Sequence, residues 1–319
     1  MKKFLILLSV FVLIMFITGL VKLAVYPNRN YSSPTLNAKL EYLEKHPEYN
    51  MYFIGSSRIN NQIDCHLIDD KIKGVKSYNL GANAGFDLEN FQMLEYILEH
   101  PSFNPRYIVL ELQDRTKITK VNLKTERSFG VFNYKNTVFA VKSQKENNNH
   151  KQIALSLVSF VINVFHFNKS MDERAVRKAH HYSTDHNQGF FPLDSTGFAR
   201  TEKAELDSAV QKRLTRYLAD HKQYKPNSII VKKINDLSEQ CKKKNIQLIM
   251  LIPGPAEAEG KKLLAYRNVL DVPVISLLDP YVYPEFYIYE NRWDYGHLNE
   301  KGAKILSLKL VPFLEKIIK

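Results

Sequence analysis

The chain has 319 residues, of which 45% are hydrophobic and 24% charged, and its formal net charge is +12. It is too apolar for a disordered chain, and its 12 glycines and 13 prolines are too few for a fibrous one. Two cysteines exclude a disulfide-stapled mini-fold and a CxxC-type zinc site. The length allows one large domain or two small ones.

The N-terminus carries the first structural signal. An uncharged run extends from Phe4 to Val21 behind two lysines, and apolar character resumes after Lys22 through Tyr26. A helix needs roughly 20 apolar residues to cross the hydrocarbon core, and the lysines favour a cytoplasmic N-terminus. A cleavable signal peptide is the alternative, but no small-x-small cleavage site is convincing near Gly19 to Ala24. We therefore expect residues 1–26 to be an uncleaved anchor.

This anchor fixes the expected location of the rest of the chain. It predicts a single-pass protein of the cell membrane whose domain lies on the extracytoplasmic side. There the basic charge faces anionic headgroups or envelope polymers, and no nucleic-acid partner is expected. Residues 27–49 are expected to form a stalk, turn-rich from Pro27 to about Asn37, and a leading helix with Leu40 and Leu43 on one side.

The next segment alternates between strand and helix patterns. Apolar residues at helical spacing mark a helix from Leu88 to Leu98. Three short apolar runs bounded by glycine or polar residues predict buried strands: Met51–Ile54, Ser77–Leu80 and Tyr107–Leu110. Strands that alternate with helices indicate a parallel sheet between helix layers.

The alternation stops after Asp114. Residues at about 115–225 are expected to be an insertion, partly helical, because no strand-helix rhythm is visible. Its apolar stretch from Ile153 to Phe167 is open to three interpretations: a buried helix, an entrance lid, or a segment lying on the membrane surface. With Asn163 and His166 inside it, this stretch is too short and too polar for a second span.

The alternation then resumes to the end of the chain. A helix is predicted near Asn227 to Lys243, and a last helix from about Asn299, where Asn can cap the first turn. Strands four and five are predicted at Ile246–Ile252 and Val272–Leu277. The expected fold for residues 50–319 is therefore a three-layer α/β/α, flavodoxin-like domain with a mainly parallel five-stranded sheet.

Two short motifs carry chemistry. Gly55-Ser56-Ser57-Arg58 directly follows the first strand, and ligands of open α/β sheets bind at the carboxyl ends of strands. Asp294-Tyr295-Gly296-His297 directly precedes the last helix. A serine nucleophile needs a base, and a histidine base needs a carboxylate to fix its tautomer. Taken singly, each motif is a turn with a helix cap; taken together, they indicate a serine hydrolase-like site.

The pair of motifs resembles the SGNH (GDSL-like) hydrolase superfamily, over about residues 50–114 and 226–316. The resemblance depends on two motifs, Phe53-Ile-Gly-Ser-Ser57-Arg and Asp294-Tyr-Gly-His297-Leu-Asn-Glu-Lys-Gly302. The resemblance implies that Ser57 is the nucleophile, His297 the general base and Asp294 its orienting carboxylate. Ser56 stands where many relatives carry Asp, so the choice between the two serines stays open.

The resemblance also implies an oxyanion hole. Its donors would be Ser57 itself, a glycine after the second strand and an asparagine after the third. Gly85 is the first choice for the glycine, and Gly81 is the alternative. The asparagine block is missing after the third strand, so Gln113 is the expected third donor, with Asn83 as its substitute.

The membrane-anchored branch of this superfamily implies a function. Its members modify envelope polysaccharides, often with a membrane-bound O-acyltransferase, and include alginate acetylation proteins and the D-alanyl transfer protein of the teichoic-acid system. The expectation is an O-acyltransferase or ester hydrolase that moves an acyl group, acetyl above all, to or from a cell-envelope glycan without cofactor or metal. The alternative is a degenerate scaffold or glycan-binding component, which the missing asparagine block and the insertion motivate and the intact triad opposes.

Three further groups of residues have both a functional and an ordinary structural interpretation. One group has metal-ligand chemistry but fits a solvated loop better: His180, His181, Asp185 and His186. Cys65 and Cys241 would both lie outside the membrane, and pairing between them stays open. An aromatic group would either stack on sugar rings or close a core: Tyr281, Tyr283, Phe286, Tyr287, Tyr289 and Trp293.

Overall fold

The computed structural model describes residues 2–25, 34–83, 85, 87–114, 131–165, 187–195, 199–255 and 260–318. Within these residues, five strands form one sheet in the order β2-β1-β3-β4-β5, and every neighbouring pair is parallel. The strands are β1 (Met51–Gly55), β2 (Ser77–Gly81), β3 (Tyr107–Glu111), β4 (Gln247–Ile252) and β5 (Val274–Ser276). The predicted α/β class and parallel five-stranded sheet are confirmed.

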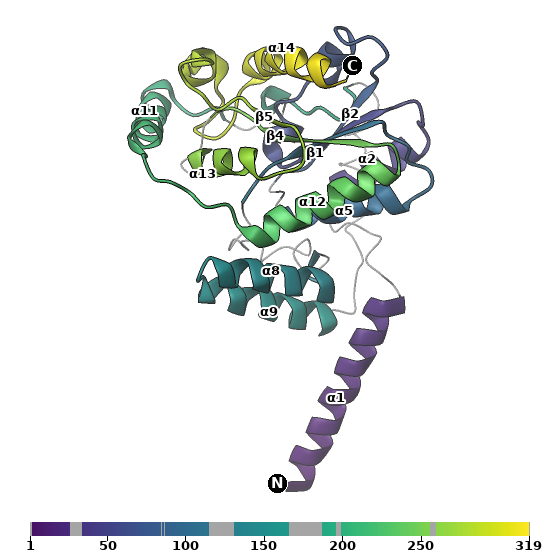
Figure 1. The fold of residues 1–319 in the computed structure, drawn as a ribbon. Coiled ribbons are helices and arrows are strands. Elements are labelled where there is room, and N and C mark those ends of the chain that lie inside the picture. Colours follow the sequence, from purple (N-terminus) through teal and green to yellow (C-terminus); the bar gives the residue numbers. More distant parts are fainter. Residues whose placement is uncertain are drawn as a thin grey trace.

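Helices cover both faces of this sheet (Figure 1). Side chains alternate between the faces, so Tyr52 and Ile54 of β1 contribute to one apolar cluster, and Met51 and Phe53 contribute to the other. The first cluster also holds α2 (Pro34–Glu44), α5 (Asp87–Glu99) and α12 (Ser228–Lys243). The second holds α3 (Ser57–Asn60), α4 (Cys65–Asp69) and α14 (Glu300–Ile317). The result is a three-layer arrangement.

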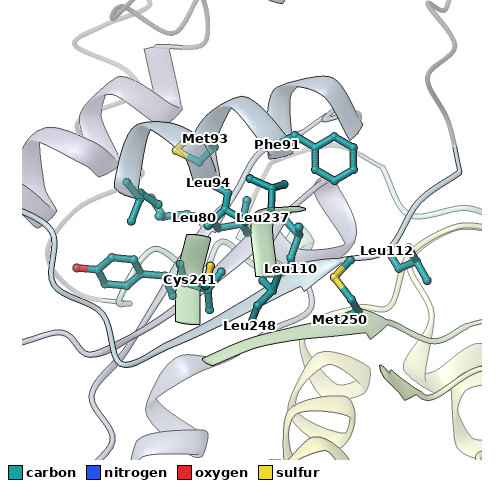
Figure 2. Close-up of a cluster of buried hydrophobic side chains, with 14 of the residues drawn as sticks. Leu80, Phe91, Met93, Leu94, Leu110, Leu112, Leu237, Cys241, Leu248 and Met250 are labelled. Carbon is teal, nitrogen blue, oxygen red and sulfur yellow. The ribbon is translucent and has the colours of Figure 1, made fainter. Parts of the chain in front are cut away.

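The first cluster shows why these segments fold as they do. The helical spacing of apolar residues in α12 places Leu237 and Cys241 on one side of that helix, above Leu110 of β3 and Leu248 of β4 (Figure 2). Leu94 of α5 completes the contact from the neighbouring helix. Each of these side chains is buried, and full burial of a leucine contributes about 1.5–3 kcal/mol.

The strand order places a switch point at β1. The chain passes from β1 to β2 on one side of β1 and then returns to β3 on its other side. The register pairs Gly55 with Gly81, so β1 and β2 end at the same level, and β3 ends beside them at Glu111. Ligands of such sheets bind at the carboxyl edge beside the switch point. The segment that begins with Ser56 starts at this edge.

The region after β3 contributes helices but no strand in its described part. They are α8 (Tyr134–Glu146), α9 (His150–Phe165), the short turn η1 (Leu193–Ser195) and α11 (Lys203–Ala219). Helices α8 and α9 pack side by side between the α/β body and α1 (Lys2–Val25) (Figure 1). The remaining short elements lie between β4 and α14: α13 (Gly260–Leu264), η2 (Ala265–Asn268), η3 (Pro284–Tyr287) and η4 (Tyr289–Asn291).

The expected apolar N-terminal helix is present. Residues Lys2–Val21 of α1 are long and apolar enough to cross a membrane, a property that anchors and signal sequences share. Two of the boundaries that differ from prediction have a clear cause in proline. Helix α2 begins at Pro34, inside the expected stalk, because proline suits the first position of a helix. Strand β5 begins at Val274, after Pro273, which has no N–H for the ladder.

The two cysteines do not pair. Both are free and buried, Cys65 in the cluster on the α14 side of the sheet and Cys241 in the cluster on the α12 side. Burial raises the pKa of both thiols, to about 12 for Cys241. Both therefore act as small apolar core residues.

Candidate active site

The turn after β1 gives its two serines different roles. Ser56 is the N-cap of α3: its hydroxyl accepts a hydrogen bond from the Arg58 N–H at 3.2 Å. Its own N–H donates to the carboxylate of Glu111 at 2.6 Å, at the end of the neighbouring strand. The Ser57 side chain lies 2.7 Å from the Nε2 atom of His297. Of the two serines, Ser57 has the geometry of a nucleophile.

Ser57, His297 and Asp294 form one chain of hydrogen bonds, although Ser57 and His297 lie 240 residues apart in sequence. The Nδ1 atom of His297 lies 3.0 Å from Oδ2 and 3.1 Å from Oδ1 of Asp294. An ionised carboxylate can only accept, so Nδ1 carries the proton and leaves Nε2 free to accept the Ser57 hydroxyl proton. About a quarter of both side chains remains exposed (26% for His297, 29% for Asp294), which leaves room for an incoming substrate.

The Asp294 carboxylate is held by its own turn. Its Oδ1 atom accepts hydrogen bonds from the N–H groups of Gly296 at 2.6 Å and His297 at 2.8 Å. Burial raises the pKa of Asp294, but the hydrogen bonds from the His297 ring and from these two N–H groups outweigh it. The net effect holds that pKa below its usual value. Asp294 therefore stays ionised, as an orienting carboxylate must.

Arg292 fixes the backbone of this turn. Its guanidinium donates to the Asp294 carbonyl through Nε at 3.1 Å and Nη2 at 2.9 Å, and to the Phe286 carbonyl through Nη1 at 3.1 Å. Arg292 also pairs with Leu298 in an antiparallel bridge that brackets the Asp294–His297 turn. Burial lowers the pKa of Arg292 to about 10, so the group keeps its charge at neutral pH.

Gln62 connects the two halves of the site. This side chain is fully buried and follows α3 by two residues. Its Oε1 atom accepts from the Leu298 N–H at 2.9 Å, and its Nε2 atom donates to the Gly254 carbonyl at 2.9 Å. Because Leu298 directly follows His297, one amide fixes His297 relative to the segment that carries Ser57.

Two glycines allow the close packing that brings these segments together. A Cβ atom on Gly55 would lie 2.6 Å from Oε2 of Glu111, the oxygen that binds the Ser56 N–H. A Cβ atom on Gly81 would lie 2.7 Å from the Cα atom of Asn60 in α3. Both positions therefore require glycine, for space rather than for backbone conformation.

The structure places each candidate oxyanion donor near this edge, with different partners. Ser57 is the first residue of α3, and the backbone N–H of a first helical residue has no acceptor within its own helix. The Gly85 N–H donates to the Ala82 carbonyl at 3.1 Å, and the Gly81 N–H donates to Asn79 Oδ1 at 2.8 Å. Gln113 is buried two residues beyond the end of β3, and the exposed Asn83 accepts through its side-chain oxygen from Asn60 at 3.2 Å.

A buried lysine lies behind this edge. Lys39 of α2 donates through Nζ to Asn60 Oδ1 at 2.7 Å and to the Gly81 carbonyl at 2.9 Å. Asn60 in turn donates to Asn83. Burial lowers the pKa of Lys39 to about 7. The end of α3 is thereby bonded to the end of β2 through an amine that titrates near neutrality.

The far end of the 115–225 insertion also contacts the site. The Phe191 N–H donates to the Asn60 carbonyl at 2.9 Å, against α3. Arg200 donates through Nε to the Arg292 carbonyl at 2.7 Å, next to the Asp294 turn, and stacks over the Tyr289 ring at 3.8 Å. The insertion therefore supports both motifs from the outside.

The histidine group and the aromatic group of the sequence analysis have different outcomes. His180, His181, Asp185 and His186 lie outside the described residues. Within the described residues, no group of three or more His, Cys, Asp or Glu side chains could hold a metal ion. Tyr283 and Phe286 are buried and stack on one another, so they close the core, whereas Tyr281 is 80% exposed.

Sequence reasoning missed the residues that support the site. Gln62 and Lys39 bond to segments distant in sequence, and Arg292 bonds to backbone carbonyls within six residues of it; no spacing or motif marks such contacts. The one available signal is a charged residue inside an apolar pattern, as Lys39 is in the leading helix.

No family model and no curated protein sequence matches the chain. Function must therefore be inferred from the geometry of Ser57, His297 and Asp294 and from the chemistry of the residues around them.

Proposed function

We propose that the protein is a serine-dependent acyl-transfer enzyme that works through an acyl-enzyme on Ser57, with His297 as general base and Asp294 as its orienting carboxylate. One observation carries the proposal: the continuous hydrogen-bond chain from the Ser57 hydroxyl through His297 to Asp294, at 2.7 and 3.0 Å. The position of Ser57, at the first turn after β1 beside the switch point, supports it. The motif resemblance to the SGNH superfamily agrees with both.

Acylation follows from the arrangement. The Ser57 oxygen attacks the carbonyl carbon of an ester while Nε2 of His297 takes the hydroxyl proton. The ester C–O bond then breaks, and the leaving alcohol takes that proton from His297. Asp294 stays ionised throughout and stabilises the positively charged ring. The products of this half-reaction are an alcohol and an acyl ester on Ser57.

Deacylation uses the same groups in the opposite direction. Water or a sugar hydroxyl gives its proton to Nε2 of His297 and attacks the acyl carbonyl carbon. The bond between that carbon and the Ser57 oxygen then breaks, and His297 returns the proton to Ser57. Water as acceptor makes the protein an esterase, and a glycan hydroxyl makes it an O-acyltransferase. We place the acceptor or substrate among cell-envelope polysaccharides and expect acetyl as the acyl group, as the resemblance implies.

The negative oxygen of the tetrahedral intermediate needs donors within hydrogen-bond reach. The Ser57 N–H is the first of these, since no acceptor within α3 can use it. Gly85 and Gln113 are the proposed partners, with Gly81 and Asn83 as alternatives. Of the two glycines, Gly85 is favoured, because its N–H bond to the Ala82 carbonyl, at 3.1 Å, is longer than the 2.8 Å bond that the Gly81 N–H makes to Asn79.

The proposal includes a place in the cell. Helix α1 would cross the cell membrane as an uncleaved anchor and hold the α/β domain on the extracytoplasmic side, close to the bilayer. A membrane-bound O-acyltransferase that delivers the acyl group is the proposed partner. The excess of lysine and arginine, +12 over the chain, suits a surface near anionic lipids and polymers.

A scaffold or glycan-binding role is the second candidate. The missing asparagine block and the bonded N–H groups of Gly81 and Gly85 favour it, because both features weaken the oxyanion hole. The aligned triad opposes it, since binding alone gives no reason to keep a base and a carboxylate in order behind a serine.

Ester turnover distinguishes these functions. Full-length protein in mild detergent is incubated with p-nitrophenyl acetate, with and without an envelope polysaccharide. Acetyl groups on the polysaccharide identify a transferase, and free acetate alone identifies an esterase. Turnover must disappear in Ser57→Ala and persist in Ser56→Ala, the matched neighbour. Absence of turnover by the folded wild type, together with glycan binding, would favour the scaffold.

A further inference from the structure

Helix α9 has the opposite polarity to that of a helix in a water-soluble domain. Its buried positions are largely polar: Ser156, Ser159 and Asn163, with Val164 beside them. Beyond its first turn, where His150 and Lys151 are exposed, its large exposed side chains are apolar, with exposed fractions between 38% and 50%: Leu157, Val158, Val161 and Ile162. In water, the apolar side of a surface helix faces the core. This inversion indicates that the outer side of α9 faces an apolar medium.

The buried side of α9 packs as helices do in membranes. It lies against α8, whose buried residues are also small or polar, such as Thr137, Ala140 and Ser143. The Asn163 amide donates to the Phe132 carbonyl at 3.0 Å, and the Ser156 hydroxyl donates to the Gln152 carbonyl at 2.9 Å. Small and hydroxyl-bearing residues at the contact are typical of helices that cannot rely on water to drive them together.

Helix α9 also contacts α1. A Cβ atom on Gly19 of α1 would lie 2.9 Å from the carbonyl carbon of Val164, and the rings of Phe16 and Phe165 lie 6.1 Å apart. Gly19 is 17 residues beyond Lys2, or about 26 Å along the helix at 1.5 Å per residue. Since the hydrocarbon core is about 30 Å thick, this contact lies near its far boundary.

We propose that α9 lies in the membrane interface, beside the end of α1, with Leu157, Val158, Val161 and Ile162 buried among lipid acyl chains. Its 16 residues are about 24 Å long, which is too short to span but suits a helix lying along the surface. In Figure 1, α8 and α9 run across the direction in which α1 leaves the body. Exposed Lys145 and Lys151, near the turn between α8 and α9, are placed to meet anionic headgroups.

This placement rests on the proposal that α1 spans the membrane, and it adds a second point of attachment. One helix alone would let the α/β body rotate about a stalk. With α9 seated in the interface, the body has a fixed orientation, because α8 joins α9 to α12: Asn227 at the start of α12 donates to the Ser143 carbonyl at 3.0 Å. The site would then be held at a constant height relative to the membrane surface.

The test uses full-length protein in vesicles of phosphatidylcholine and phosphatidylglycerol. A cysteine in place of Val158, or of Val161 as a second site, carries an environment-sensitive fluorophore. The native Cys65 and Cys241 are fully buried, so we expect the thiol reagent to reach them slowly. We expect quenching by a spin label near the headgroup end of the acyl chain to be several-fold stronger for Val158→Cys and Val161→Cys than for Tyr281→Cys, an exposed control.

Labelling of Phe11→Cys separates the two proposals. Quenching at position 11 by a spin label near the methyl end of the acyl chain, with no quenching at 158 or 161 by either spin label, would overturn the placement of α9 while leaving the span of α1 intact. Fluorophores at 158 and 161 that are shielded from both lipid spin labels and water, in a chain that cross-links as a dimer, would mean that a second copy covers α9 and would also overturn it. Ester turnover measured on the same vesicles reports the proposed function separately.

Discussion

Replacement of Gln62 by leucine should damage both stability and the proposed reaction. Gln62 is fully buried, and its amide satisfies the Leu298 N–H and the Gly254 carbonyl, each at 2.9 Å. Leucine has a similar volume, so the cavity is small, but two buried backbone groups lose their partners. Each such group costs about 1–3 kcal/mol, which predicts a loss of about 2–6 kcal/mol in the free energy of unfolding.

The same change should displace His297. Its neighbour Leu298 loses the hydrogen bond to the Gln62 side chain, which ties it to the segment after α3. A shift of about 1 Å in a catalytic group lowers rates by roughly 100-fold. Urea unfolding of the full chain in mild detergent, followed by circular dichroism, measures the first effect. The rate of reaction with a fluorophosphonate measures the second, and Gln211→Leu on the exposed side of α11 is the matched control.

Gln62→Glu separates the two hydrogen bonds. The carboxylate still accepts from Leu298 but cannot donate to Gly254, whereas a protonated carboxyl can do both. Burial raises a carboxyl pKa, so the stability of this variant relative to the wild type should be higher at pH 5 than at pH 7. The reasoning is refuted if Gln62→Leu unfolds within about 0.5 kcal/mol of the wild type and reacts at its rate.

Three further predictions concern the site and its support. Asp294→Asn should slow fluorophosphonate labelling by a factor on the order of 10³–10⁴ at an unchanged fold, because the His297 ring is no longer held in the tautomer with its proton on Nδ1. Labelling at the wild-type rate would contradict this. Gly81→Ala should destabilise by about 1–3 kcal/mol in urea, since its Cβ meets the backbone of Asn60, whereas Gly296→Ala, with its nearest atom at 3.5 Å, should not. Lys39 has a pKa lowered to about 7, so the native state releases its proton before the unfolded state does, and stability should rise between about pH 7 and 10.5 by up to about 1.4 kcal/mol per pH unit. Lys39→Met should remove this slope, and an equal slope in both proteins would show that the amine is not buried as described.

The sheet was predictable because its strands are buried on both faces. Such strands read as short continuous apolar runs, and Met51–Ile54 and Ile246–Ile252 match the observed β1 and β4 within a residue at each end. The expected helix of residues 227–243 is likewise observed as α12, because its apolar stripe has a clear helical period.

The support of the site was not predictable, and the physical reason is the same in each case. Gln62 and Arg292 bind backbone carbonyls and N–H groups, which every residue offers, so their partners leave no mark in the sequence. Lys39 is buried by tertiary packing that overrides its usual preference for solvent. The inverted polarity of α9 is likewise visible only once the buried side of the helix is known.

Labelling with a fluorophosphonate is the sharpest test of whether Ser57 is an activated nucleophile. This probe forms a covalent bond only with a serine that a neighbouring base activates. The full-length protein should become labelled, peptide mapping should place the label on Ser57, Ser57→Ala should not react, and Ser56→Ala should react normally. A label that persists in Ser57→Ala, or a folded wild-type protein that takes up no label, would contradict the assignment of Ser57 as an activated nucleophile.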